Sequence, residues 1–219
     1  MTKLIYDEIW DRFVHSDHVS RMPHRDGTGV GLVVHIQAHE IIEKISAILN
    51  QLRQLDHFAP VLLDTLHLTV RNLGTLVDHP TGDQSVSPKQ LPTLIDAIGR
   101  ALTGMHRFPI HLRRVSSFFV CPIVEVHDRG RILAIRKRLS AELDPLGLTD
   151  FDYGPRGFVP HLTLGSYTED SDGALARQML SALRETDIGE IQVAELALIR
   201  ADLTAGICCL EPIHEFKLL

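Results

Sequence analysis

The chain has 219 residues, of which 44% are hydrophobic and 23% are charged, and its formal net charge at pH 7 is −6. These values exclude a disordered or fibrous protein, and the negative charge argues against a broad basic surface that holds extended duplex nucleic acid. A chain of this length can bury one large core. We therefore expect a monomer in which residues 1–28 are an N-terminal extension and residues 29–219 form a single bilobed domain.

No pattern in the sequence points to a membrane or to secretion. The longest apolar runs, such as Val30–Val34 and Ile191–Ile199, are far shorter than the roughly 20 residues that cross a bilayer. Acidic residues interrupt the N-terminus, where a signal peptide would need a continuous apolar segment. The cysteines, at positions 121, 208 and 209, form an odd set without CxxC spacing. We expect reduced thiols buried in strands, no zinc or disulfide framework, and a cytoplasmic location.

Apolar periodicity and turn residues predict the elements in chain order. After a short helix at Tyr6–Val14, the first half should form a strand, a helix, a strand, a helix and a strand, at Gly31–Gln37, His39–Leu55, Thr65–Leu73, Leu91–Leu102 and Phe108–Phe118. The second half should form a strand antiparallel to the last one, a helix, a strand, a helix and two strands, at Phe119–His127, Arg129–Leu146, Phe158–Leu164, Gly173–Glu185, Ile191–Ala201 and Ile207–Leu218. The second half repeats the order of the first, which predicts two lobes that meet at a shared cleft.

The second strand of the first half contains a histidine and a threonine two residues apart. Side chains at alternate positions of a strand share a face, so His67, Thr69 and Arg71 should point the same way. Leu68 and Val70 should face the helices instead. The expected result is an imidazole and a hydroxyl exposed to the cleft.

The corresponding strand of the second half repeats this pattern. His161 and Thr163 share one face, and Tyr167 follows on that face. A lone His-x-Thr pattern is expected about once by chance in this composition, but requiring a leucine between the two lowers the expectation to about 0.1. The repetition in matching strands is therefore the signal. The competing interpretation, in which each histidine is only a partly buried structural residue, applies better to the other histidines of the chain.

Two histidines facing one cleft can perform acid–base chemistry. Cleavage of a phosphodiester needs one group to take a proton from the attacking water or hydroxyl, and another to give a proton to the leaving oxygen. Imidazole serves both purposes near neutral pH, because its unperturbed pKa is about 6.5. Hydroxyls such as those of Thr69 and Thr163 can orient and stabilise phosphate oxygens.

The segments Leu66–Gly74 and Val159–Leu164 resemble the twin HxTx signatures of the 2H phosphoesterase superfamily, in particular its bacterial 2′-5′ RNA ligase-like proteins and RNA 2′,3′-cyclic phosphodiesterases. The resemblance implies a bilobed α+β fold with pseudo-two-fold symmetry, in which antiparallel-rich sheets line a central cleft and helices lie outside. It also implies hydrolysis of a 2′,3′-cyclic phosphate or related diester of a nucleotide or RNA terminus, with no metal and no cofactor. By analogy His161 would be the base and His67 the acid, and the threonines would bind the phosphate.

The flanks of both motifs depart from the family pattern and leave the substrate open. Asn72 stands where many relatives have an aromatic residue, and Gly165–Tyr167 stands where many have an arginine. Arg71 could supply a missing phosphate contact or could simply cover apolar surface. Tyr167 could stack on a base or pack internally. Arg156, in the loop before the second motif, is a further candidate for the phosphate or an ordinary solvated charge.

Other features favour simpler interpretations. His15, His18 and His24 lack the spacing and the accompanying ligands of a metal site, so we expect them to be solvated. The glycines of Gly27–Gly31 precede a strand, whereas a phosphate-binding glycine loop follows one, so this segment should be a turn. The alternatives to hydrolysis are an RNA 2′-5′ ligase and a nucleotide- or RNA-binding module without turnover. A structural or oligomerisation domain has no apolar stripe to support it.

Overall fold

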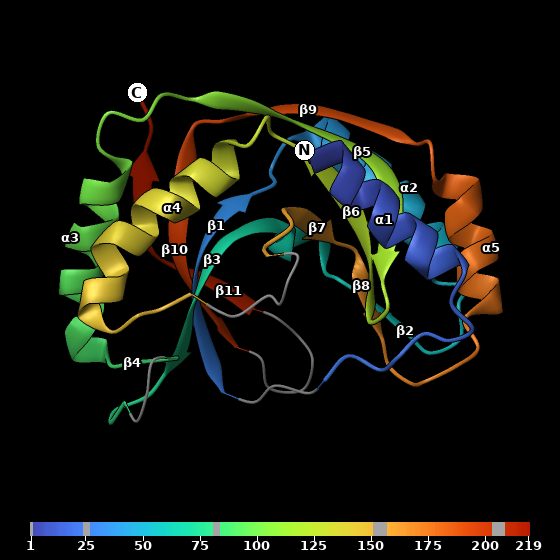
Figure 1. The fold of residues 1–219 in the computed structure, drawn as a ribbon, viewed down its shortest axis with the longest axis horizontal. Coiled ribbons are helices and arrows are strands. Elements are labelled where there is room, and N and C mark those ends of the chain that lie inside the picture. Colours follow the sequence, from blue (N-terminus) through green and yellow to red (C-terminus); the bar gives the residue numbers. More distant parts are fainter. Residues whose placement is uncertain (1, 24–26, 81–83, 151–156, 203–208) are drawn as a thin grey trace.

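The structure is a computed structural model that describes residues 2–23, 27–80, 84–150, 157–202 and 209–219 (Figure 1). The α-helices are α1 (Thr2–Val14), α2 (His39–Leu52), α3 (Leu91–Leu102), α4 (Arg131–Leu143) and α5 (Ala174–Leu183). Short 3₁₀ turns are η1 (Leu63–Thr65), η2 (Pro88–Gln90) and η3 (Asp144–Leu146). The strands are β1 (Thr28–His35), β2 (Phe58–Pro60), β3 (His67–Leu76), β4 (Ser85–Val86), β5 (Phe108–Phe118), β6 (Cys121–His127), β7 (His161–Thr163), β8 (Gly165–Tyr167), β9 (Asp187–Val193), β10 (Glu195–Asp202) and β11 (Cys209–Lys217).

One curled sheet organises the described part of the chain. Its strands follow the order β11-β10-β1-β3-β7-β6-β5-β9, with β4 paired to β3, and the small β2–β8 sheet stands apart. Neighbours along the main order are antiparallel. The two motif strands, β3 and β7, are adjacent in the middle of this order. The sheet therefore divides there into lobe A, formed by β11, β10, β1 and β3, and lobe B, formed by β7, β6, β5 and β9.

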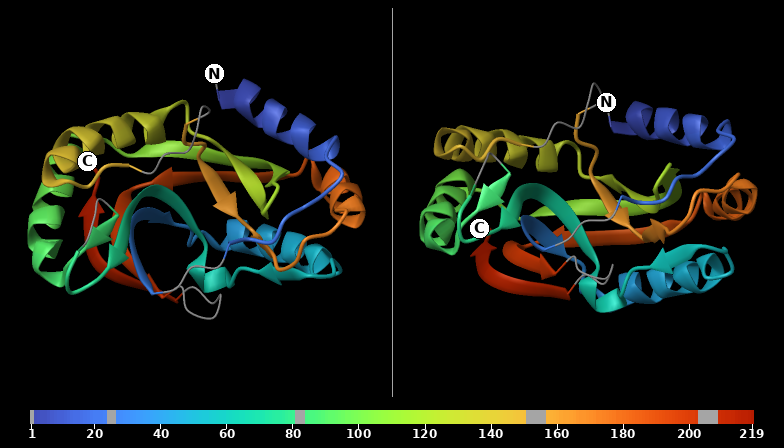
Figure 2. Two further views of the ribbon diagram at one scale, coloured as in Figure 1. Left: turned by 60° about the horizontal axis from the view of Figure 1, so that its bottom comes forward. Right: turned by 90° about the horizontal axis from the view of Figure 1, so that it is seen from below.

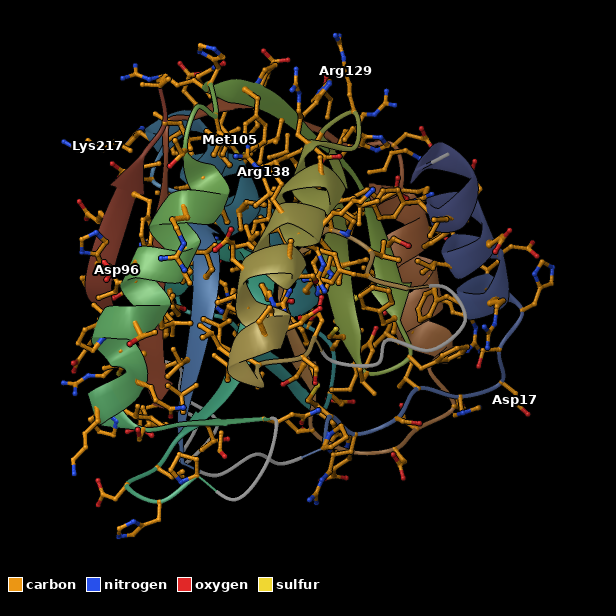
Figure 3. All side chains as sticks on the ribbon, turned by 60° about the vertical axis from the view of Figure 1, so that its left-hand side comes forward. Asp17, Asp96, Met105, Arg129, Arg138 and Lys217 are labelled. Carbon is orange, nitrogen blue, oxygen red and sulfur yellow. The ribbon has the colours of Figure 1, made fainter. Side chains whose placement is uncertain are left out.

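Amphipathic helices cover the lobes. In α2 the buried residues Ile41, Ile45, Ile48 and Leu52 recur every three or four positions, so they form one apolar stripe. This helix contacts β9 and α5 on lobe B, whereas α3 and α4 pack together against β11 and β3 of lobe A. Figure 3 looks onto α3 and α4, and the exposed side chain of Asp96 projects outward from α3. One continuous hydrophobic core lies between these helices and the sheet.

The N-terminal helix occupies the opposite side of lobe B. It contacts β5 and β6, and both views of Figure 2 show α1 on one side of these strands and α2 on the other. Its side chains Tyr6, Ile9 and Phe13 are buried, which explains why a helix forms there. Lobe B is thus a sheet with helices on both faces.

The observed elements confirm the predicted α+β fold and its duplicated order, with local differences. The predicted strand Ile191–Ala201 is two strands, β9 and β10, which separate at Ala194 and lie in opposite halves of the sheet order. The β2–β8 pair was not predicted, because these strands are three residues long and carry too short a pattern. The buried Cys121 fits the prediction for the thiols, but Cys209 is exposed, and Cys208 lies outside the described residues. No described helix has both the length and the apolar content needed to cross a bilayer.

Candidate active site

The two motifs meet at the junction of the lobes. Leu68 of β3 pairs with Leu162 of β7 in antiparallel register. Extending this register by one residue in each direction sets His67 opposite Thr163 and Thr69 opposite His161. Each histidine therefore lies across from the threonine of the other motif. Directly opposed side chains in such a pair have Cβ atoms about 4.5–5.5 Å apart, close enough to act on one small group.

Burial along both strands follows the predicted alternation. The two histidines and the two threonines are partly exposed, whereas the side chains of Leu68 and Leu162 are fully buried. The leucines pack into the core and hold the strands against each other. The sheet thus presents two imidazoles and two hydroxyls on one face at the lobe junction.

Both imidazoles are oriented by the same local contact. The Nδ1 atom of His67 lies 2.8 Å from the carbonyl oxygen of Thr65, and the Nδ1 atom of His161 lies 2.8 Å from the carbonyl oxygen of Val159. A carbonyl oxygen can only accept, so each Nδ1 must carry the hydrogen and donate it. The neutral ring then has its lone pair on Nε2, and the protonated ring donates from Nε2. The same nitrogen can serve as base or as acid in either lobe.

The surroundings favour one proton on the pair rather than two. Burial lowers the pKa of His67, the hydrogen bond to Thr65 opposes this, and nearby His35 lowers it further. Burial also lowers the pKa of His161, its hydrogen bond to Val159 raises it, and the charge of His67 lowers it. When one imidazole is protonated, the other resists protonation, which produces one acid and one base in the same site.

The two histidines differ in their partners on the next strand. His67 pairs with His35 of β1, and His161 pairs with Glu125 of β6. Glu125 is fully buried and forms an ion pair with Arg184, whose guanidinium is also buried. Arg114 approaches the same carboxylate at 3.7 Å. The His161 side therefore contains a buried, paired carboxylate that the His67 side lacks at the equivalent position.

The N-terminal helix reaches the His161 strand. The single hydrogen of the Tyr6 hydroxyl is shared between the carbonyl oxygens of Val126 and Pro160, and the hydroxyl oxygen accepts from the amide of Val126 at 3.0 Å. Burial raises the pKa of this hydroxyl, so it stays protonated. Pro160 directly precedes His161, and therefore α1 is attached to the backbone that carries the second histidine.

A pocket of about 270 Å³ opens beside His161. It lies between α1, the turn that joins β5 to β6, and residues 157–159. The Phe118 ring and the His161 imidazole are perpendicular, in a T-shaped contact with centroids 4.9 Å apart. Apolar rings and the imidazole thus share one lining.

The structure corrects the prediction that Arg71 contacts the phosphate. The register between β1 and β3 shifts at Val70, which is an extra residue in β3, so the two-residue alternation stops before Arg71. The Arg71 side chain is fully buried and donates to Ser140, Asp144 and the carbonyl of Leu148. It connects β3 to the end of α4 and lies on the helix side of the sheet.

The two-residue alternation of a strand also predicts the wrong face for Tyr167. Strand β7 ends at Thr163, and β8 then pairs with β2, although the backbone amides of Leu164 and Tyr167 still donate to Pro122 and Val120 at the start of β6. Gly165 permits this change, because a Cβ atom there would lie 2.4 Å from the carbonyl oxygen of Ala59. The Tyr167 hydroxyl consequently lies in the interior, 3.1 Å from the Ser117 hydroxyl, and contacts no exposed surface that could receive a phosphate.

The remaining candidates divide into exposed and undescribed residues. Arg156 and His24 lie outside the described residues. His15 and His18 are exposed, and each contacts a neighbouring aspartate. In the described ranges no three metal-binding side chains cluster. Sequence reasoning missed Tyr6 and Glu125, although a glutamate inside the otherwise apolar strand Cys121–Val126 was a signal for a buried ion pair.

The comparisons with known proteins agree with this geometry. The model of the 2′-5′ RNA ligase superfamily matches residues 36–205, which is more than half of the chain. The protein therefore belongs to the 2′-5′ RNA ligase superfamily of 2H phosphoesterases, as the twin motifs predicted. A comparison with curated protein sequences found no significant match.

Several solved structures have the same fold. The protein TT0787 of Thermus thermophilus is 17% identical, with a TM-score of 0.62 over 87% of this chain and 97% of that chain. Ligand-free LigT of E. coli is 19% identical, with a TM-score of 0.61 over 89% of this chain and 99% of that chain. LigT in complex with 3′-AMP gives a TM-score of 0.59 at 19% identity, with the same shares of the two chains. At these identities the likeness establishes the shared bilobed fold.

Proposed function

We propose that this protein is a metal-independent phosphodiesterase that hydrolyses a 2′,3′-cyclic phosphate or a related nucleotide or RNA phosphodiester. The observation that carries the proposal is the pairing of the motif strands, which opposes each histidine with the threonine of the other motif. E. coli LigT, which has the same fold, has been solved in complexes with NADP⁺, ATP and 3′-AMP. These complexes support a nucleotide as the substrate of this protein. Membership of the superfamily supports phosphodiester chemistry.

In the proposed reaction the histidines divide the two proton transfers. Neutral His161 accepts a proton from water at Nε2 while the water oxygen forms a bond to phosphorus. The bond between phosphorus and one ribose oxygen breaks, and protonated His67 gives its Nε2 proton to that oxygen. The hydroxyls of Thr69 and Thr163 donate to the non-bridging oxygens, where negative charge accumulates in the transition state. A proton has then moved from His67 to the product and from water to His161, so the pair exchanges its protonation states in one turnover.

RNA 2′-5′ ligation is the second candidate, and the name of the matching superfamily supports it. A 5′-hydroxyl would replace water as the nucleophile, and the same two proton transfers would follow. Binding without turnover is the third candidate. Substrate comparison separates these three functions.

The test is hydrolysis of 2′,3′-cyclic mononucleotides and 2′-5′-linked oligonucleotides in the presence of a chelator, with His67→Ala, His161→Ala and the double variant. Each single substitution should lower kcat by roughly 10²–10⁴-fold, because each removes one proton transfer. The double variant should lose little more than the more damaged single variant, since the two groups act as a unit. His106→Ala is the matched control, because His106 is exposed and outside both motifs.

Three outcomes would contradict the proposal. Turnover that persists in the histidine variants would remove these residues from the reaction. Activity that disappears with the chelator and returns with a divalent cation would exclude the metal-independent mechanism. Nucleotide binding without hydrolysis by the wild-type protein, with the variants binding equally well, would support the binding module instead.

A further inference from the structure

We propose that the N-terminal helix α1 completes the substrate site by forming a pocket for the nucleobase of the substrate. This inference rests on the proposed function, because it assumes that a nucleotide phosphate lies at the two histidines. It assigns a specificity function to a segment that precedes the residues matched by the superfamily model, which begin at residue 36. Two residues of the pocket lining, Ile9 and Arg12, therefore lie outside the matched range.

The position of the pocket carries the first step. His161 is itself part of the lining, so the pocket opens directly beside one of the two imidazoles. A substrate phosphate held by the histidines would place the attached nucleoside within reach of it. The volume of about 270 Å³ is slightly below the roughly 300–1,000 Å³ of pockets for drug-sized ligands, which suits a single ring system rather than a dinucleotide.

The chemistry of the lining carries the second step. Its main contributors are apolar or aromatic side chains with one cation and the imidazole, namely Ile9, Phe118, Phe119, Phe158, Arg12 and His161. Proteins bind single-stranded bases by stacking them on aromatic rings and on arginine, without a need for base-specific hydrogen bonds. The combination therefore fits a flat, weakly polar heterocycle better than a second phosphate or a sugar chain.

Arg12 is available for such a ligand. Its guanidinium lies 5.6 Å from the centroid of the Phe119 ring, and no described carboxylate is within ion-pair distance of it. A planar guanidinium that already lies over one ring can extend the stack to a base or contact the edge of that base. The side chain is exposed, so a ligand can reach it without moving the helix.

Fixed anchors hold the helix in place and make it a wall of the site. Tyr6 is bonded to the backbone at Pro160 and Val126, and Asp7 forms an ion pair with Arg114 at 2.8 Å. The guanidinium of Arg184 lies 4.6 Å from the centroid of the Trp10 ring. The partners lie in β5, in β6, directly before β7 and directly after α5, so the pocket exists before the ligand arrives, which reduces the ordering cost of binding.

The experiment compares two cyclic phosphates in wild type, Arg12→Ala and Phe119→Ala. Adenosine 2′,3′-cyclic phosphate carries a base, and glycerol 1,2-cyclic phosphate does not. The kcat/KM for the adenosine compound divided by that for the glycerol compound should fall by about ten-fold or more in each variant. Arg12→Ala removes a stacking partner of the base, and Phe119→Ala removes the ring, already stacked with His18, over which the Arg12 guanidinium lies. Glu8→Ala is the matched control, since Glu8 is exposed on the same helix and outside the pocket lining. Trp10 is the only tryptophan, so an unchanged emission spectrum reports that α1 is still docked.

The outcomes separate this inference from the proposed function. An unchanged ratio, whether both rates stay the same or fall together, would overturn the base pocket and leave the histidine chemistry untouched. If the wild-type protein hydrolyses neither these compounds nor the 2′-5′-linked oligonucleotides, the proposed function fails, and calorimetric binding of 3′-AMP then tests the pocket. Binding that weakens about ten-fold in Arg12→Ala but not in Glu8→Ala would support the pocket. Equal binding in both variants would overturn it.

Discussion

Lobes A and B carry the same histidine motif in very different surroundings. In both, Nδ1 donates to the carbonyl two residues earlier in the chain, at the same distance of 2.8 Å. The residue opposite the histidine is His35 in lobe A and Glu125 in lobe B. The features that the two lobes share thus set the orientation of the two imidazoles, while the residues that differ at equivalent positions of the lobes set the charge and the enclosure around each imidazole.

We call the strand beside His67, β1 with His35, the lobe A flank, and the strand beside His161, β6 with Glu125, the lobe B flank. The two flanks differ in solvent access as well as in charge. His35 lines a pocket of about 780 Å³ together with Gln37, Glu190, Glu195 and Glu215. The corresponding flank in lobe B lies beneath α1, and Glu125 there is fully buried. Substitutions on the lobe B flank should therefore damage stability most, and those on the lobe A flank should mainly tune titration.

The largest effect is expected from Glu125→Ala. This change leaves the guanidinium of Arg184 buried without its main carboxylate, which typically costs about 3–5 kcal/mol of unfolding free energy. Urea unfolding of the variant and the wild type measures this loss of unfolding free energy. Glu185→Ala is the control, because Glu185 also touches Arg114 but is 79% exposed, and surface pairs contribute about 0–1 kcal/mol. Equal losses in the two variants would show that burial does not distinguish these carboxylates.

Tyr6→Phe should have the next largest effect. It removes the hydroxyl that satisfies the Val126 amide and the Pro160 carbonyl, and a buried group left unpaired costs about 1–3 kcal/mol. Tyr167→Phe removes a buried hydroxyl bonded to Ser117 and should cost a similar amount. Only Tyr6→Phe should also lower kcat, because only Tyr6 touches the backbone next to His161. A kcat that falls equally in both variants would attribute the loss to general destabilisation.

The two motif histidines should make stability depend on pH. Burial holds the pKa of each below its ordinary value near 6.5, so the unfolded chain binds protons that the folded chain refuses. Their contribution is fully present above about pH 6.5 and decreases as the pH falls from there towards the folded-state values. Unfolding midpoints between pH 5 and 8 should show a weaker pH dependence in His67→Gln and His161→Gln. A steeper dependence in these variants would reverse the assigned direction.

The sequence predicted the repeated features of the molecule and missed the unrepeated ones. The motif strands follow a two-residue alternation set by Leu68 and Leu162, so His67 and His161 could be placed on one face from the pattern alone. Arg71 could not, because a bulge at Val70 is a tertiary adjustment that leaves no mark in the local pattern. The position of the Tyr167 side chain was predicted wrongly for a similar reason, since β8 pairs with β2 outside the main sheet.

The docking of α1 on lobe B could not be predicted from the sequence either, although the helix itself was predicted. Its periodicity indicates an apolar face at Tyr6, Ile9 and Phe13, but periodicity does not identify the surface that this face covers. Only long-range contacts, such as that between Tyr6 and Pro160, assign it to lobe B. Register shifts and docking partners are properties of the folded chain, and a single sequence encodes them too diffusely to be read from local patterns.

The smallest effect, and the one that tests the lobe A flank, is expected from His35→Gln. His35 lowers the pKa of His67, and its own pKa is lowered by burial against the opposing influence of Glu195 and Glu215. Replacing it with a neutral side chain should raise the pKa of His67, so the pH–rate profile, whose two apparent pKa values belong to the coupled pair of motif histidines, should move to higher pH. Gln37→Ala, in the same pocket, should leave the profile in place. A profile that stays in place in His35→Gln, or that moves equally in Gln37→Ala, would show that His35 does not tune the titration of the pair.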